Sequence, residues 1–351
     1  MAALVIAFSA LIDYCEITLQ MGANMQGRNG AMDVLRIAAC LAVILLHSAA
    51  GYVYKFNQVP LWEWQIGNFL DSATRWCVPV FVLLSGALNI SQGNKESAPF
   101  FRKRFTRLLP VVVFWTAAYV YYTGMMDPSF VLHNVLSGYP YYHLYFLFLI
   151  AGLYFMTPSF SVYAEAVGEE RFLKTGVCCL VFTVLAMTIS VPAFNAMTLA
   201  LPYVGYYLLG KSLSRTPIPM KVAIFGLSAS IIFTTVVTWL LVEKHGITVS
   251  GIWLYDFWTP NVAVMAICVF SIFARLNIKQ TPILAYISGV TLGVYLVHVM
   301  VLETLQKAMV SHGLVFSAFP TITIHFLGTA VVSFAIALFM GKVPILKRLF
   351  S

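Results

Sequence analysis

Long apolar runs separated by short polar connections fill almost the whole chain. About ten of these runs approach the roughly 20 apolar residues that a helix needs to cross the hydrocarbon of a bilayer. Only 10% of the 351 residues are charged, against about 25% in a soluble domain, and no polar stretch is long enough to form a separate soluble domain. The sequence therefore predicts an all-α polytopic membrane protein with about ten transmembrane helices. The runs cover residues 34–54, 68–90, 107–125, 141–162, 173–191, 198–213, 220–242, 258–275, 282–306 and 318–341.

The basic residues are distributed unequally between the two sides that these spans define. With the N-terminus in the cytoplasm, 17 of the 21 Lys and Arg residues fall in cytoplasmic segments, and the other four (Lys55, Arg75, Lys244 and Lys307) lie outside or within spans. Cytoplasmic loops carry such an excess of Lys and Arg, so both termini are expected to be cytoplasmic. The net charge of +8 fits this topology better than a nucleic-acid surface, and no nucleic-acid partner is expected.

The first 31 residues do not continue this pattern. Met1–Leu19 is apolar but is interrupted by two acidic residues, and no basic region precedes it, so it is a poor signal peptide. Gly22–Gly30 has the composition of a flexible linker. We therefore expect a loosely attached extension over residues 1–31 and one transmembrane domain over residues 32–351.

The first apolar run holds an arginine at its start and a histidine deep inside it. Arg36 and His47 are eleven residues apart, which on a helix at about 100° per residue leaves an offset of about 20°, so both lie on one face. They are separated by roughly 16 Å along the axis, with the small side chains of Cys40 and Val43 between them on that face. An ionisable side chain within hydrocarbon costs roughly 3 kcal/mol and by default indicates a function. A cation at the mouth of a narrow apolar slot and an imidazole well inside it are therefore expected.

Residues 102–110 form a basic cluster at the cytoplasmic entry of the third span. Such clusters flank membrane spans generally and act as topology signals. Arg104 and Arg107, however, are spaced i, i+3 and project to one side of a helix, where two planar guanidiniums suit the recognition of phosphate. The spacing leaves both interpretations open.

Three further candidates lie toward the outer ends of their spans. Arg75 lies inside the second span and would be costly there without a partner, which makes it a candidate to contact substrate. Pro79 and Gly86 in the same run are expected to permit a kink or a close helix approach, and so to be structural. His143 and His298 fall where amphipathic side chains extend to the membrane interface, and they are either structural or in contact with substrate.

The six cysteines fall mostly within apolar runs, with no metal-ligand spacing. Buried free thiols behave as small hydrophobic side chains. Neither a disulfide framework nor a metal site is therefore expected.

Four short motifs follow one another along the chain: Arg36 with His47 after ten intervening residues, Val78–Gly86, Arg104–Arg107 and Tyr295–His298. Together they resemble the motifs of the membrane-bound acyltransferase 3 family. That family has a first-span arginine or lysine followed by a histidine, a Val-Pro-x-Phe-x-x-x-Ser-Gly signature, an Arg-x-x-Arg pair and a late Tyr-Leu-x-His element. The chain departs from the family near Val82, where a second phenylalanine is frequent. The resemblance extends from about residue 32 to the C-terminus and is closest to the branch containing the enterobacterial common antigen O-acetyltransferase.

The resemblance implies transfer of an acyl group, usually acetyl from acetyl-CoA, to a hydroxyl of a cell-surface polysaccharide or lipid-linked glycan. A neutral histidine can take the proton of a sugar hydroxyl near pH 7, which makes His47 the expected catalytic residue. The expected acyl-CoA-binding residues are Arg36, Arg104 and Arg107, and the expected acceptor-binding residues are Arg75, His143 and His298.

The resemblance further implies a multi-pass protein of the bacterial inner membrane, in contact with lipids, that uses acetyl-CoA as a substrate and holds no tightly bound cofactor. Association into a homo-oligomer stays open. Two other functional classes remain: a glycolipid or polysaccharide transporter or flippase whose Arg and His line a pathway, and a sensor or assembly protein that keeps the fold without catalysis. Acetyl-CoA hydrolysis, or protection of Arg104 and Arg107 by CoA, distinguishes the enzyme from the transporter.

Overall fold

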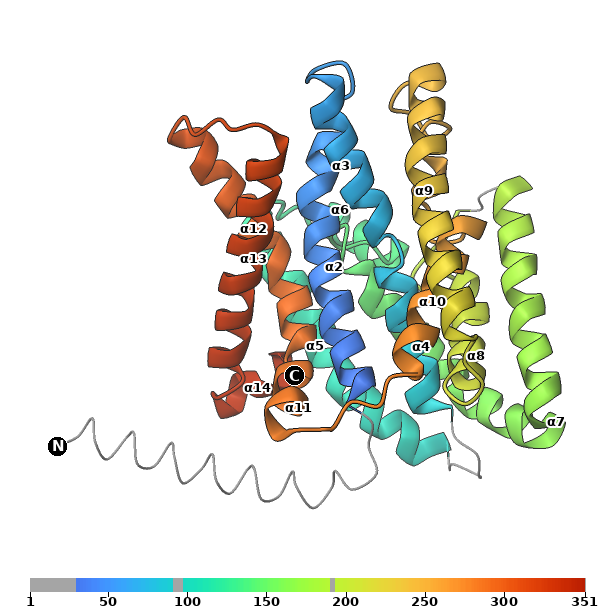
Figure 1. Ribbon diagram of the computed structural model, residues 1–351. Coiled ribbons are helices and arrows are strands. Elements are labelled where there is room, and N and C mark those ends of the chain that lie inside the picture. The colour runs from blue at the N-terminus through green and yellow to red at the C-terminus, as the bar shows by residue number, and fades with distance from the viewer. Residues whose placement is uncertain (1–29, 91–96, 190–192, 351) are drawn as a thin grey trace.

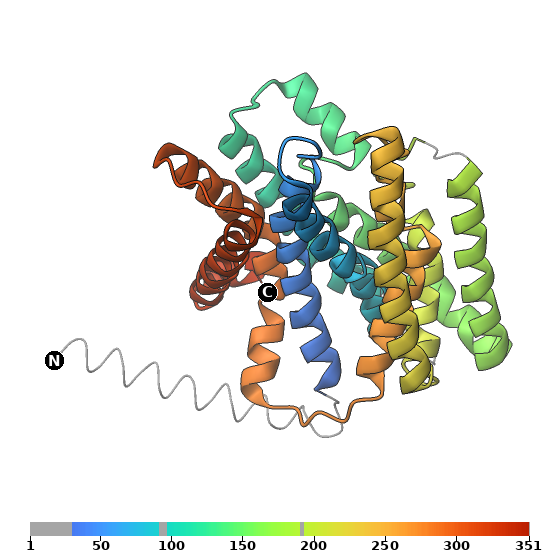
Figure 2. The same ribbon diagram turned by 45° about the horizontal axis from the view of Figure 1, so that its top comes forward.

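The protein is a bundle of helices whose long axes run mostly in one direction (Figures 1 and 2). The computed structural model describes residues 30–90, 97–189 and 193–350, and every regular element within these ranges is a helix. In Figure 1, α2 (Ala31–Val53) begins at one end of the bundle, called the lower end below, and ends at the opposite, upper end. Residues 1–29 of the expected N-terminal extension lie outside the described residues.

The helices follow the apolar runs of the sequence, although several runs are divided or joined. A run becomes a helix here because, within lipid, the backbone N–H and C=O groups must be satisfied inside the segment itself. The elements after α2 are α3 (Leu61–Thr74), α4 (Cys77–Asn89), α5 (Ser97–Thr123), α6 (Pro128–Ser137), α7 (Tyr145–Ile189), η1 (Leu201–Tyr203), α8 (Val204–Leu213), α9 (Met220–His245), η2 (Trp253–Tyr255), α10 (Pro260–Ala274), α11 (Pro282–Gly289), α12 (Thr291–Ser311), α13 (Ala318–Met340) and α14 (Pro344–Phe350).

The ten predicted spans are not ten long helices. Within the described residues, five helices are long and apolar enough to cross a membrane, and the pair α11–α12, bent by 47°, makes a sixth if it is taken as one span. Two predicted runs merge in α7, and the runs around α4 and α8 give helices of only 13 and 10 residues, too short to cross alone. The protein is thus an all-helical, multi-pass membrane protein with five or six candidate spans, and the predicted number of ten is not confirmed.

The helix α7 is a hairpin of two arms rather than one rod. Gly168 breaks it with φ 76° and ψ 170°, a left-handed backbone conformation that favours glycine. Across the turn the Tyr163 hydroxyl lies 2.8 Å from the Thr175 hydroxyl, which places the arms side by side (Figure 1). The two runs predicted on either side of this glycine are therefore the two arms.

Two glycines allow α4 and α8 to cross in backbone contact. A Cβ at Gly86 would lie 1.8 Å from the carbonyl oxygen of Tyr207, and one at Gly210 would lie 1.9 Å from that of Leu83. Small residues at helix crossings are typical of membrane proteins. The structural role predicted for Gly86 is confirmed. Pro79 is the third residue of α4, where the N–H that proline lacks would have no partner within the helix, so no helical hydrogen bond is lost.

The connections that carry most of the basic residues gather at the lower end of the bundle. The turn of α7, the α8–α9 and α10–α11 connections and α14 all lie there (Figure 1). The α2–α3 turn, the end of α9 and the α12–α13 connection lie at the upper end. This separation follows the asymmetry of Lys and Arg in the sequence, and the cytoplasmic location of the lower end and of both termini stays a prediction from that asymmetry.

Candidate active site

Three histidines from distant parts of the chain meet in the middle of the bundle. The ring of His47, on α2, lies with its centre 5.3 Å from that of His298, on α12. The ring of His143, just before α7, lies 5.4 Å from His298. His143 and His298 are buried, whereas His47 is partly accessible. The structure therefore brings together one residue predicted to be catalytic and two predicted to contact the acceptor.

The interface location expected for His143 and His298 is wrong. The bend between α11 and α12 starts α12 at Thr291, so His298 lies two turns into a helix and not near the end of a span. There its Nδ1 contacts the carbonyl oxygen of Tyr295. His143 precedes α7 and is covered by the ring of Tyr119, 4.8 Å away. Both side chains consequently face the interior of the bundle.

Tyrosines hold this histidine cluster in place. The Tyr295 hydroxyl donates to the carbonyl oxygen of His143 over 2.6 Å, and the Tyr119 hydroxyl donates to that of Leu296 over 2.9 Å. The ring of Tyr142 meets His47 edge-on at 5.4 Å. No pattern in the sequence predicted a role for Tyr119 or Tyr142, although Tyr142 directly precedes His143 and Tyr295 belongs to the motif that ends at His298.

One cavity, here called the arginine cavity, contains all three arginines predicted to bind acyl-CoA. Its volume is about 380 Å³, within the roughly 300–1,000 Å³ of small-molecule sites. At its inner end lies Tyr295, whose ring centre is 5.6 Å from that of His298. The cavity thus runs from three cations to the edge of the histidine cluster. Its lining includes Arg36, Arg104, Arg107, Phe81, Phe146 and Tyr295.

A buried carboxylate orients Arg36 toward this cavity. Asp33, only 1% exposed, accepts hydrogen bonds from Arg36 over 3.1 Å, from the Ser288 hydroxyl over 2.7 Å and from Gln280 over 2.6 Å. Arg36 also donates to Ser288 over 2.9 Å. The network ties the start of α2 to the end of α11, and it leaves the Arg36 side chain 23% exposed. Asp33 was not singled out in the sequence, although its i, i+3 spacing from Arg36 was visible there.

Arg104 is positioned from two other helices. Its guanidinium donates to Asn89 Oδ1 at the end of α4 and lies 5.3 Å from the ring centre of Tyr154 on α7, a cation–π geometry. Arg107 lines the same cavity one turn later. The two arginines of the basic cluster therefore project to one side of α5, as their spacing predicts.

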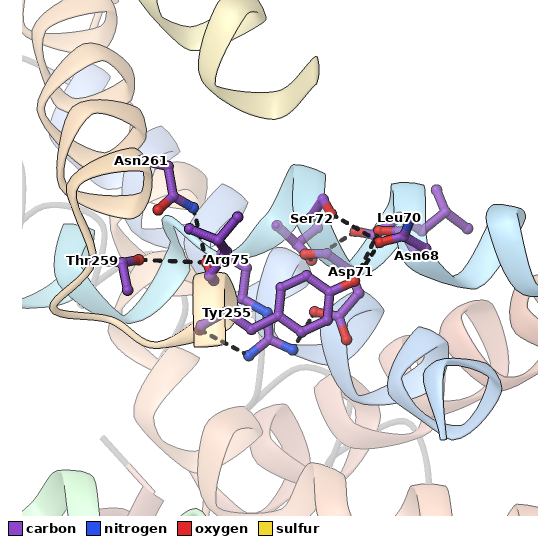
Figure 3. A network of polar contacts seen from close by, with 10 residues as sticks. Asn68, Leu70, Asp71, Ser72, Arg75, Tyr255, Thr259 and Asn261 are labelled. Atoms are coloured by element: carbon purple, nitrogen blue, oxygen red, sulfur yellow. Dashed lines mark hydrogen bonds and ion pairs between the residues drawn. The ribbon is translucent and has the colours of Figure 1, made fainter. Parts of the chain in front are cut away.

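Arg75 belongs to a separate polar network between α3 and η2 (Figure 3). Its guanidinium pairs with Asp71, donates to the carbonyl oxygen of Tyr255 over 3.1 Å and lies 4.1 Å from the centre of that ring. The Tyr255 hydroxyl in turn donates to Asn68 Oδ1 over 2.6 Å. The network braces α3 against the segment that leads into α10, and Arg75 does not line the arginine cavity.

This pairing removes the reason for which Arg75 was selected. A lone arginine in a span is costly, but Asp71 stands one turn earlier, buried and 1% exposed. Contact of Arg75 with the acceptor stays a prediction.

The described residues supply the parts for acyl transfer from an anionic donor. Three guanidiniums can bind phosphates, the apolar walls suit a thin acyl-carrying arm, and an imidazole can accept a proton. Among these residues no group of three or more His, Cys, Asp or Glu is arranged to hold a metal ion.

Comparison with known proteins gives one positive result. Residues 29–338 match the sequence profile of a family described as an acyltransferase domain, the acyltransferase 3 family. A search of curated proteins found no significant match, and neither did a search of solved structures. The matched range includes every residue of the histidine cluster and of the arginine cavity.

Proposed function

Because the chain belongs to the acyltransferase 3 family of membrane acyltransferases, we propose that it is an O-acetyltransferase that uses acetyl-CoA. The acceptor is a hydroxyl of a cell-surface polysaccharide or of a lipid-linked glycan. We further propose a relation to the branch that contains the enterobacterial common antigen O-acetyltransferase, which the four motifs resemble. In this proposal the protein resides in the bacterial inner membrane, with the lower end of the bundle facing the cytoplasm, where acetyl-CoA is made.

The arginine cavity is the observation that carries this proposal. The phosphates of CoA, the most anionic part of the donor, bind at Arg36, Arg104 and Arg107, where charge-assisted hydrogen bonds are available. The uncharged pantetheine arm extends along the apolar wall past Phe81 and Phe146, toward Tyr295. This places the thioester next to the histidine cluster, since Tyr295 contacts His298.

At the cluster, His47 acts as the general base. It takes the proton of the acceptor hydroxyl while that oxygen attacks the thioester carbonyl carbon, so that a C–O bond forms and the C–S bond breaks. The CoA thiolate leaves, and the proton from His47 neutralises it. His298 packs against the reacting imidazole, and His143 packs against His298 in turn, so that the cluster fixes the position of His47. A general base of this kind contributes about 10²–10⁴-fold to the rate.

Two measurements test the proposal. Mass spectrometry of surface glycans from a deletion strain should show the loss of one acetyl group per repeating unit. Complementation with the wild type should restore it, and complementation with His47→Ala should not. In parallel, the purified protein should release CoA from acetyl-CoA. A transporter would instead change the amount of glycan at the surface without changing its acetylation, and it would release no CoA.

A further inference from the structure

A second cavity lies beside the histidine cluster, toward the upper end of the bundle. We call it the tyrosine cavity. It has a volume of about 330 Å³, and it is enclosed by the last turns of α5, by α6 and by the segment that leads to α7. None of the functional residues predicted from the sequence lines it. Its walls are Thr116, Val120, Thr123, Met125, Phe130, Val131, Asn134, Tyr139, Pro140, Tyr141 and Tyr142.

Two helices relate the positions of the two cavities to the cluster. Along α5, residues 104–111 line the arginine cavity, Tyr119 covers His143, and residues 116–123 line the tyrosine cavity. Along α12, Thr291 and Tyr295 line the arginine cavity, and His298 follows in the cluster.

Glu303 comes next on α12, about 7.5 Å beyond His298 along the axis. It accepts a hydrogen bond from Tyr141 of the tyrosine cavity over 2.6 Å.

The chain between residues 139 and 154 repeats the same order in reverse. Residues 139–142 line the tyrosine cavity, His143 lies in the cluster, and residues 146–154 line the arginine cavity. Along this segment the histidine cluster therefore lies between the two cavities, and the order of Tyr295, His298 and Glu303 on α12 agrees with this arrangement.

Tyr142 joins the tyrosine cavity directly to the proposed base. Its ring forms part of the cavity wall and meets His47 edge-on at 5.4 Å, although 46% of the residue is exposed. Tyr142 is therefore the side chain that stands between this cavity and His47.

The two cavities differ in chemistry. The arginine cavity has three cations in its wall, whereas no charged residue lines the tyrosine cavity. Its polar groups are two threonine hydroxyls, the Asn134 amide and tyrosine hydroxyls, and aromatic faces supply much of the rest. Aromatic faces pack against the C–H face of a sugar ring, and neutral hydroxyl and amide groups hydrogen-bond to sugar hydroxyls.

The position of Glu303 adds a second argument for a ligand site. An ionisable residue within a candidate span is costly and marks a functional site by default. Its carboxylate fixes the Tyr141 hydroxyl and so sets the orientation of one wall of the cavity. Lys307, one turn later, lies over the ring of Tyr122.

We infer that the tyrosine cavity is the acceptor subsite and that it binds a neutral sugar ring of the acceptor, an inference that rests on the proposed function. The sugar enters from the upper end and presents its hydroxyl to His47. The donor thioester arrives from the arginine cavity on the other side. The hydroxyl proton goes to His47, the hydroxyl oxygen bonds to the acetyl carbon, and CoA leaves through the mouth by which it entered.

Cysteine protection tests this assignment without measuring turnover. Thr123→Cys places a thiol in the tyrosine cavity, and Leu88→Cys places a matched thiol in the arginine cavity, in a background where the exposed Cys178 is serine. The probes are a panel of neutral methyl glycosides, the corresponding hexuronic acids, CoA and phosphatidylglycerol vesicles, each applied before a membrane-impermeant maleimide.

At least one neutral glycoside should slow labelling of Thr123→Cys, and CoA should slow labelling of Leu88→Cys alone. Protection of Thr123→Cys by CoA, by lipid alone, or by no glycoside of the panel would overturn the inference. Absence of CoA protection at Leu88→Cys would instead count against the proposed function, so the two failures are distinguishable.

A kinetic variant pair extends the test with the glycoside that protects best. Asn134→Ala removes one hydrogen-bonding group from the cavity wall and should raise the KM for that acceptor about tenfold, with the KM for acetyl-CoA unchanged. His133→Ala, an exposed neighbour on α6 that does not line the cavity, is the control and should change neither constant. A rise confined to the KM for acetyl-CoA would contradict the assignment.

Discussion

Two arginines in the first two predicted spans have the same kind of partner and different surroundings. Arg36 pairs with Asp33 at i, i+3, and Arg75 pairs with Asp71 at i, i+4; each carboxylate is only 1% exposed. Arg36 keeps 23% of its side chain exposed, in the wall of a cavity. Arg75 is more enclosed, with Tyr255 both accepting its hydrogen bond and covering its face.

The difference shows what an arginine in an apolar run signifies. In both cases a buried carboxylate offsets the cost of removing the guanidinium from water. The presence of the arginine alone therefore indicates a polar network and not a ligand. What separates the two is whether the paired guanidinium still faces a cavity. By this criterion Arg36 is placed to bind an anion, and Arg75 is placed to brace α3 against η2.

The largest effect is expected at His47, toward which the arginine cavity leads. His47→Ala should lower kcat about 10²–10⁴-fold, because a general base is lost, while CoA protection of the arginine cavity persists. The measurement is CoA release by the purified protein, with the exposed His312→Ala as control. Near wild-type turnover in His47→Ala would mean that the cavity leads to a different base.

The next effect concerns the Arg75 network and should appear in stability. Asp71→Ala leaves a buried guanidinium without its carboxylate, which costs about 3–5 kcal/mol, so the thermal midpoint in detergent should fall by many degrees. The double variant Asp71→Leu, Arg75→Leu removes both charges and should lose less than the single variant. An unchanged midpoint in Asp71→Ala would show that the network does not brace the fold.

The sequence could predict the arrangement along α2 because helical geometry determines it. Arg36, Cys40 and His47 were expected on one face, and the structure confirms this: they contact Ser288, the Thr291 carbonyl and His298 in the same order. Each of these three partners lies on α11 or α12, so one face of α2 meets one bent pair of helices.

Contacts between distant segments could not be predicted in the same way. His143 and His298 are separated by more than 150 residues, and their meeting depends on the bend before α12 and on the turn before α7, neither of which has a periodic signal. The tyrosine cavity likewise arises from α6, which has no buried residue and whose position is set by packing. The predicted number of ten spans is not confirmed, because apolar runs such as those around α4 and α8 form helices of only 13 and 10 residues, a length that hydropathy alone does not determine.

At the Arg36 site the effect should fall on donor binding. Arg36→Ala should raise the KM for acetyl-CoA about 10–100-fold, the equivalent of one charge-assisted hydrogen bond, and Arg36→Lys should recover part of it because the charge returns without the planar fork. Arg75→Lys is the matched comparison and should leave this KM unchanged. An equal rise in both variants would remove the distinction between the two arginines.

The smallest effect is expected for a third ion pair, Lys174 with Glu170, which has the same i, i+4 spacing as Asp71 with Arg75 but is exposed on α7. Exposed pairs are screened by solvent and contribute little. Lys174→Ala should therefore change neither the thermal midpoint nor the KM for acetyl-CoA beyond experimental error. A fall comparable with that of Asp71→Ala would mean that burial does not explain the first comparison.

The side from which acetyl-CoA enters is the most direct test of the proposed donor site, because the three arginines of the arginine cavity lie toward the lower end of the bundle. Sealed vesicles of known orientation, with acetyl-CoA supplied to one face at a time, measure this. We expect transfer only when acetyl-CoA reaches the cytoplasmic face. Transfer in right-side-out vesicles supplied with external acetyl-CoA alone would contradict this expectation.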